Sequence, residues 1–285
     1  MSLILYGAMD YDNIDEDTKT KILQLHDPAE TLKTLRPKTV QEMIRKNFWK
    51  LCWCWLNWKE TQSEEENKIM RIFCRNSYHI CGNSSLYSND TERGLYNNMS
   101  RINHSCVPNS TWCYVMGDFK RHQVRALMTI EKDQEILIYI QDGEPEFHFG
   151  SREFRRQELL ETSGFLCVCS ECSLEGEALE DNEKMRADIR ENEREIDQLM
   201  THEGNVRRRS MKKFMKLSQE RMNLVEKLGI RGTMFVLEMM SFYAAATKAK
   251  EMGVTAPDPN KMKQEALKHA QICGDGCVNL FFGHK

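Results

Sequence analysis

Three cysteines, Cys167, Cys169 and Cys172, lie close together in the sequence. A loop this short can present three thiolates to one tetrahedral Zn²⁺, which then needs a fourth ligand from elsewhere in the chain. The alternative interpretation is three unpaired cysteines that happen to cluster. The chain has eleven cysteines, and where thiols stay reduced, metal ligation is a more frequent use of so many cysteines than disulfides. The spacing therefore predicts a zinc site.

The string Ser100-Arg-Ile-Asn-His-Ser-Cys-Val-Pro-Asn109 is a second group of residues that could do chemistry. It gathers amide, imidazole, hydroxyl and thiol groups, although Pro108 makes an ordinary turn the alternative interpretation. Further along, Tyr139 lies near the end of the apolar run 135–140. Taken alone, this pattern is that of a β-strand aromatic that packs in the core of a sheet.

These motifs resemble, in chain order, the catalytic half of SET-domain protein lysine methyltransferases, and are more similar to the branch that combines SET and MYND domains. The likeness runs from about residue 76 to residue 172. The matching pieces are Asn76-Ser-Tyr-His-Ile80, Arg93-Gly-Leu-Tyr96, the string from Ser100 to Asn109, Arg155-Arg156 with Leu159 and Phe165, and the three cysteines. Several motifs in the right order make the resemblance specific.

The resemblance implies a role for each site residue. The residues implied to bind S-adenosylmethionine are Asn76, Ser100, Ile102, Asn103, His104 and Phe165. Phe165 would stack on the adenine, and Tyr139 would be the catalytic tyrosine. Its phenol would orient the neutral amine of a lysine, whose pKa is about 10.4 in water. Cys106 would join Cys167, Cys169 and Cys172 as the fourth ligand of a structural zinc.

Three features differ from the family pattern. No glycine-rich opening strand is recognisable in residues 1–75, and no Cys/His series of a MYND finger precedes residue 100. Ser163 stands where relatives usually have another active-site tyrosine. We therefore expect a SET domain that is N-terminally incomplete and binds its cofactor more weakly than complete relatives do. The apolar stretch Leu3-Ile-Leu-Tyr6 could cover an exposed sheet edge instead.

Hydrophobic periodicity predicts the elements that must position these residues. Residues 1–75 are predicted to be helical, with a capping box at Thr39 and Glu42. A small antiparallel β unit, with a turn at 131–134, is predicted from the runs 111–116, 122–130 and 135–140. From residue 176 the period is helical again, and Asp258-Pro259 and Gly274 mark the start and end of a last helix.

We expect an α+β fold with small SET-type β-sheets and a helical insert, a zinc-bound post-SET loop, and an all-helical C-terminal region. The predicted SET domain is 1–140, divided into a helical part, 1–75, and a cofactor and catalytic half, 76–140. The post-SET zinc segment is predicted at 141–175 and the helical C-terminal domain at 176–285.

Charge and hydropathy exclude other classes. Forty Lys and Arg against 43 Asp and Glu give a net charge of −3, so the positive footprint of a direct nucleic-acid binder is missing. No stretch approaches the ~18 apolar residues that span a bilayer, and the N-terminus lacks the basic lead-in of a signal peptide. We expect a cytoplasmic or nuclear protein. The basic run 207–213 could be a nuclear address or a contact for an acidic partner, although such a run is more often the solvated face of a helix.

Two functions from different classes remain open. The first is transfer of a methyl group from S-adenosylmethionine to a lysine of a histone or another protein. The second is a zinc-stabilised SET-like module with little or no activity, which binds a protein partner through its helical C-terminal region. Cofactor binding distinguishes the two, because only the enzyme requires it.

Overall fold

The computed structural model describes residues 2–5, 15–25, 64–65, 68–69, 72, 76–79, 93–115, 118–140, 145–201 and 206–283. The chain forms two compact units that interleave along the sequence. The first comprises Met1–Ile102, Tyr114–Gln123 and Arg155–Cys167, and the second comprises Asn103–Cys113, Val124–Phe154 and Val168–Lys285. The three-part division by sequence remains a prediction.

A three-stranded sheet lies in the first unit. Its strands are β1 (Ser2–Leu5), β2 (Ser77–His79) and β3 (Arg93–Tyr96), in the order β1-β3-β2 with both pairs antiparallel. Leu3 lies opposite Leu95, so the apolar N-terminal stretch does cover an edge of β3. The prediction that all of 1–75 is helical is therefore wrong at residues 2–5, because β3 offers that run a partner strand.

Helical structure in the first unit includes α1 (Glu16–Leu23) and the short 3₁₀ helix η2 (Met99–Arg101). The Asp15 carboxylate caps α1 by accepting from the Thr18 N–H at 2.9 Å. A buried cluster ties α1 to the sheet, and its members are Ile22, Leu25, Ile69, Ile72 and Leu95. The predicted capping box at Thr39 and Glu42 lies outside the described residues.

Two further strand pairs follow in the sequence. Strands β5 (Ser110–Val115) and β6 (Asp118–Ala126) form a hairpin, which contributes residues to both units. Strands β4 (Asn103–His104) and β7 (Leu137–Ile138) pair in parallel within the second unit. The antiparallel prediction is thus wrong for 135–140, which pairs with the motif string and not with the hairpin. The turn at 131–134 is confirmed by a hydrogen bond from the Gln134 N–H to the Glu131 carbonyl at 3.1 Å.

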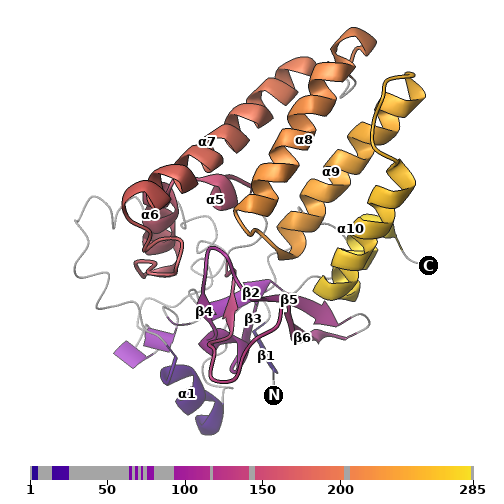
Figure 1. The fold of residues 1–285 in the computed structure, drawn as a ribbon. Helices are drawn as coiled ribbons and strands as arrows, with labels where there is room; N and C mark the ends of the chain where they lie inside the picture. The colour runs from indigo at the N-terminus through magenta and orange to yellow at the C-terminus, as the bar shows by residue number, and fades with distance from the viewer. Residues whose placement is uncertain are drawn as a thin grey trace. The chain divides into compact units, whose positions relative to one another are not determined.

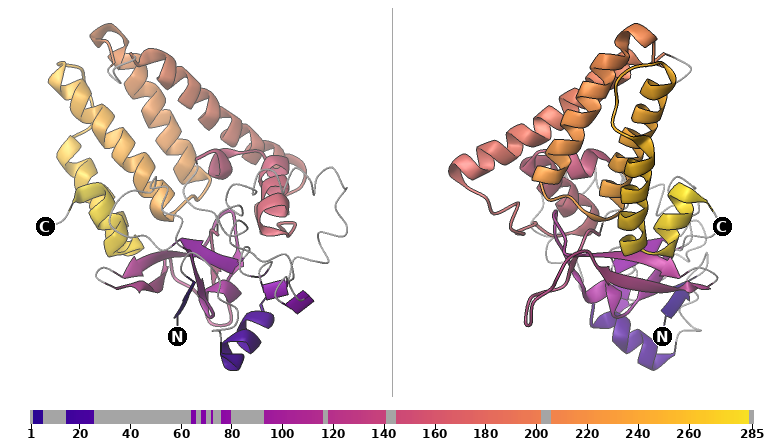
Figure 2. Two further views of the ribbon diagram at one scale, coloured as in Figure 1. Left: turned by 180° about the vertical axis from the view of Figure 1, so that it is seen from behind. Right: turned by 45° about the vertical axis from the view of Figure 1, so that its right-hand side comes forward.

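Helices dominate the remainder of the chain and confirm the α+β fold with a helical C-terminal region. They are α5 (Pro145–Phe149), α6 (Arg152–Ser163), α7 (Gly176–Leu199), η3 (Arg208–Ser210), α8 (Met211–Lys227), α9 (Gly232–Glu251), α10 (Pro259–Cys273) and α11 (Asp275–Phe282). Helices α7 to α10 lie side by side in sequence order (Figures 1 and 2). Asp258 caps α10 and Gly274, at φ 111°, ends it as predicted, although α11 follows.

The helical region has its own core. One buried cluster joins α5, α7, α8 and α9, and consists of Phe149, Ile189, Val225, Leu228, Ile230 and Met234. Beside it, Arg221 of α8 makes two 2.7 Å hydrogen bonds to the Glu238 carboxylate of α9. Burial alone would lower the pKa of Arg221, but the carboxylates of Glu238 and Glu193 together more than offset this and raise it. The pair stays charged and fixes α8 against α9.

No helix among the described residues is both long and apolar enough to cross a membrane.

Candidate active site and metal centre

Four cysteine thiols gather at one point. The Sγ atoms of Cys106, Cys167, Cys169 and Cys172 all lie within 4.8 Å of one another, and three of the four residues are buried. Cys106, Cys169 and Cys172 belong to the second unit. Cys167 is the last residue of the final segment of the first unit. It is two residues from Cys169, so the short loop between them keeps Cys167 near the other thiols.

The spacing of these thiols suits zinc. Four sulfurs about 2.3 Å from a tetrahedral Zn²⁺ lie about 3.8 Å from one another, and the Sγ atoms of Cys106 and Cys172 are 3.6 Å apart. The loop is closed by a turn in which the Ser173 N–H donates to the Cys169 carbonyl at 2.9 Å. A set of four thiolate ligands leaves no open coordination position, so a zinc held here would be structural.

The parallel pairing of β4 with β7 sets the geometry around Tyr139. Asn103 lies opposite Leu137 and His104 opposite Ile138, so the motif string runs beside the segment that ends in Tyr139. Asn109 holds this arrangement, because its buried amide accepts from the Leu137 N–H at 2.9 Å and donates to the Glu135 carbonyl at 2.8 Å.

His104 connects the tyrosine to the cysteine cluster. Its Nδ1 accepts a hydrogen bond from the Ile140 N–H at 3.3 Å, so the neutral ring carries its proton on Nε2. Nε2 lies 3.6 Å from the Cys106 Sγ, an arrangement that stabilises a thiolate. The ring also lies 5.0 Å from the ring of Tyr139, centroid to centroid. One imidazole thus touches both predicted centres.

Tyr139 is half-buried and contacts two histidines. In addition to His104, the His148 ring of α5 stacks on it, with centroids 3.9 Å apart and planes inclined by 19°. The backbone is fixed as well, since the Trp112 Nε1–H donates to the Tyr139 carbonyl at 3.4 Å. The predicted catalytic tyrosine therefore has a defined ring orientation.

The other predicted cofactor residues divide between the units. Asn103 lies in the second unit, and its side chain donates to the Glu135 carboxylate at 2.6 Å. Asn76, Ser100, Ile102 and Phe165 lie in the first unit. There the structure brings Asn76 and Ser100 together, because the Ser100 hydroxyl donates to the Asn76 carbonyl at 2.7 Å.

Two of these first-unit groups have partners in their own unit. The Asn76 amide donates to the Ile72 carbonyl at 2.7 Å, and the Ile102 N–H donates to the Met99 carbonyl at 3.0 Å. Phe165 is half-buried and follows Gly164, which comes directly after α6 and has a left-handed conformation with φ 77°. The roles of all these residues toward a cofactor remain predictions.

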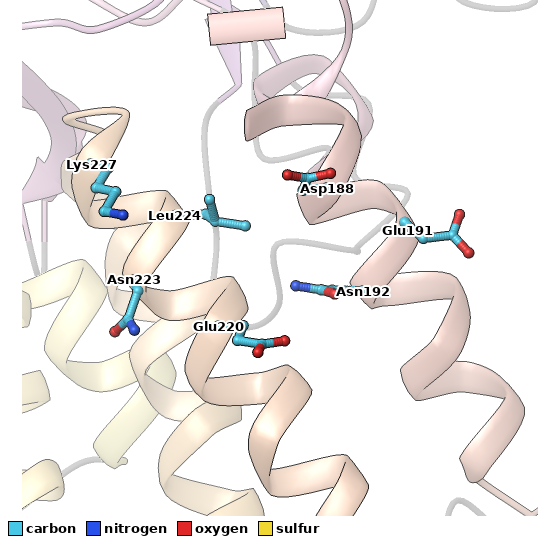
Figure 3. A pocket seen from close by; sticks show the side chains of 7 residues that line it. All are labelled: Asp188, Glu191, Asn192, Glu220, Asn223, Leu224 and Lys227. Carbon is cyan, nitrogen blue, oxygen red and sulfur yellow. The ribbon is translucent and has the colours of Figure 1, made fainter. Parts of the chain in front are cut away.

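A separate cavity of about 310 Å³ opens between α7 and α8. Figure 3 shows Asn192 of α7 and Glu220 of α8 reaching toward each other across it. The remaining lining residues are Asp188, Glu191, Asn223, Leu224 and Lys227. None of the predicted site residues lines this cavity, so it is not the predicted cofactor site.

Two residues near Tyr139 were not assigned from the sequence. Asn109 is part of the motif string. A buried amide needs both a donor and an acceptor as partners, and this requirement is the signal that could have identified Asn109 as a structural residue of the site. His148 carried no such signal, because ring stacking between residues nine positions apart depends on where α5 folds back.

Comparisons with known proteins point to one family. The family model of the SET domain matches residues 12–140. The chain is 29% identical over 135 residues to Histone-lysine N-methyltransferase SMYD3 of Mus musculus. The aligned residues make up 46% of this chain and 29% of that protein. The Homo sapiens SMYD3 protein is 28% identical over 135 residues, with the same two shares.

A fungal protein gives a further match. Histone-lysine N-methyltransferase set5 of Schizosaccharomyces pombe is 37% identical over 94 residues, which covers 32% of this chain and 27% of that protein. The chain thus spans less than a third of the length of each of these relatives.

Proposed function

We propose that this chain, a SET-domain protein similar to histone-lysine methyltransferases, transfers a methyl group from S-adenosylmethionine to a lysine of a protein substrate. The domain match and the printed activities of the relatives support this class of reaction. A histone is the first substrate to try, because both kinds of relative are named for histone lysines.

The observation that carries the proposal is the parallel pairing of β4 with β7. It runs the Asn103-His104 strand, the centre of the predicted cofactor motif, beside the segment that ends in Tyr139. A methyl transfer needs the methyl donor and the group that orients the acceptor within one small site. Strand pairing supplies that proximity through the backbone, so it does not depend on flexible side chains.

The residues that would hold S-adenosylmethionine are Asn76, Ser100, Ile102, Asn103, His104 and Phe165. When bound, the cofactor supplies a methyl on a sulfonium, which is already a good leaving group. The side-chain amides and backbone groups would fix its polar ends, and Phe165 would stack on the adenine. The chain's contribution is therefore alignment and electrostatics.

Tyr139 would act on the incoming lysine. The amine must be neutral to attack, and the Tyr139 oxygen can accept an N–H from it so that the lone pair points along the reaction line. The two neighbouring imidazoles restrict the ring's orientation. Cys106, Cys167, Cys169 and Cys172 would hold a structural zinc that ties the motif string to the loop after α6.

Transfer of a tritiated methyl group tests the proposal. Zinc-loaded chain is incubated with labelled S-adenosylmethionine and either histones or cell-extract proteins. We expect label in the protein fraction, and Tyr139→Phe should lower it at least about 100-fold while the far-ultraviolet dichroism stays unchanged. Folded, zinc-loaded wild type that transfers no label, beside an active SMYD3 control, would favour the binding-module alternative.

A further inference from the structure

Helix α5 places His148 against Tyr139. The two rings are nearly parallel, with centroids 3.9 Å apart, and only 8% of His148 is exposed. The helix lies in the segment that separates Tyr139 from the cysteine loop. One face of Tyr139 is thus covered by a side chain of α5.

Three arginines of the helical region hold α5 in place. The Arg186 guanidinium of α7 donates to the His148 carbonyl, and Arg190 donates to the Phe149 carbonyl. The Arg221 guanidinium lies 5.0 Å from the centre of the Phe149 ring, which is almost fully buried. The two hydrogen bonds satisfy carbonyls at the end of α5, a short helix that could not hold its position alone.

Arg186 also binds the cysteine loop. It is fully buried, its Nη2 lies 3.2 Å from the Glu171 carboxylate, and its Nε donates to Asn182 at 2.8 Å. Asn182 in turn donates to the same Glu171 carboxylate at 2.5 Å. Glu171 stands between Cys169 and Cys172, so one buried cation connects the predicted metal loop to the backbone of His148.

We propose that His148 is a positioning residue for Tyr139, and that Arg186 holds it there by joining α5 to the Glu171 loop. The inference rests on the proposed function of Tyr139. A flat ring packed on the face of a phenol limits how far the phenol can swing about χ1, so the hydroxyl oxygen keeps its position while substrate binds. Misplacement of a catalytic group by about 1 Å can cost on the order of 100-fold in rate.

Substitutions at position 148 separate ring packing from volume. His148→Leu keeps a side chain of similar volume and removes the flat face, whereas His148→Phe keeps the face and removes the ring nitrogens. We expect His148→Leu to lower kcat about 10- to 100-fold with the KM for S-adenosylmethionine changed less than about 3-fold. His148→Phe should restore kcat to within about 3-fold of wild type.

A matched control lies elsewhere in the same unit. His269 of α10 packs edge-to-face on Phe235, with centroids 4.8 Å apart, and has no role in the predicted site. His269→Leu removes a comparable ring contact and should leave kcat unchanged. Arg186→Met should reproduce the kcat loss of His148→Leu, because it removes the hydrogen bond to the His148 carbonyl without touching either ring.

A spectroscopic readout makes the inference independent of activity. In protein with ¹³C-labelled tyrosine rings, the Tyr139 signal is the one missing from Tyr139→Phe. We expect the stacked imidazole to shift that signal away from the position of an unstacked tyrosine. His148→Leu and Arg186→Met should return it toward that position, and His148→Phe and His269→Leu should not.

The outcomes distinguish a failure of the positioning role of His148 from a failure of the proposed function. An active wild type with unchanged kcat and Tyr139 signal in His148→Leu would overturn the positioning role. If wild type is inactive but its Tyr139 signal responds as expected, the proposed function fails while the packing relation stands. If His148→Leu does not fold, Arg186→Met and the signal of His148→Phe decide instead. An unshifted Tyr139 signal in wild type would overturn the inference outright.

Discussion

The side-chain amide of Asn109 bridges two backbone groups of the segment that ends in Tyr139. It accepts from the Leu137 N–H at 2.9 Å and donates to the Glu135 carbonyl at 2.8 Å, while 5% of the residue is exposed. Both bonds lie beside the β4–β7 pair, which is only two residues long on each strand. A pair this short needs side-chain support to keep its register.

Asn109→Ala should therefore destabilise the chain and disable the site. It leaves the Leu137 N–H and the Glu135 carbonyl without their partner, and an unsatisfied buried group costs about 1–3 kcal/mol. We expect a loss of about 2 kcal/mol or more in the free energy of unfolding, measured by urea titration. Asn223→Ala, an exposed control on α8, should change it by less than about 0.5 kcal/mol. Equal effects of the two variants would contradict the bridging role.

One zinc per chain is expected at the cysteine cluster. The motivation is the mutual approach of four thiols within 4.8 Å. Elemental analysis of freshly purified protein should give about one equivalent of zinc, and Cys169→Ser should reduce it below half an equivalent and lower the unfolding temperature. Cys113→Ser, a buried cysteine outside the cluster, should keep the metal. Zinc well below half an equivalent in wild type would refute the site.

The pH dependence of stability should depend on His122. Its ring packs edge-on against the Tyr96 ring, with ring centroids 4.1 Å apart. Burial lowers the pKa of His122 from 6.5 to about 4. Between these pH values the unfolded chain binds the proton and the folded chain does not, so this contribution is present above pH 6.5 and is lost as pH falls toward 4.

His122→Phe removes this titration while it keeps a ring against Tyr96. Between pH 7.5 and pH 5, wild type should lose at most about 2 kcal/mol more stability than the variant does. Urea unfolding at the two pH values measures the difference. Parallel losses in the two proteins would show that His122 stays protonated or exposed in the fold.

The sequence predicted the cysteine cluster better than the strand partners. The spacing of Cys167, Cys169 and Cys172 carries its own signal, and Cys106, which the family resemblance implied, lies beside them. The ends of α10 at Asp258 and Gly274 were also predicted, since caps are local features. By contrast, the strand that pairs in parallel with residues 137–138 lies more than thirty residues away in the sequence. Alternation of apolar residues with a period of two predicts a strand but does not identify the strand it pairs with.

The network around His148 shows the same limit. A stacked imidazole, a buried arginine and a glutamate inside the cysteine loop have no common sequence pattern. Each looks like a surface polar residue until α5 and α7 are packed, and Arg186 is fully buried only because Glu171, Asn182 and a carbonyl surround it. Such residues can be assigned only from tertiary structure.

Calorimetric titration of S-adenosylmethionine into the zinc-loaded chain tests the central claim most directly, because it does not require the protein substrate to be known. We expect saturable binding at one site with a Kd of about 10–100 μM, that is, about −5.5 to −7 kcal/mol. Asn103→Ala should weaken it at least about 10-fold, whereas Asn223→Ala should not. Absence of detectable binding by folded, zinc-loaded wild type would contradict the account of this chain as a methyltransferase.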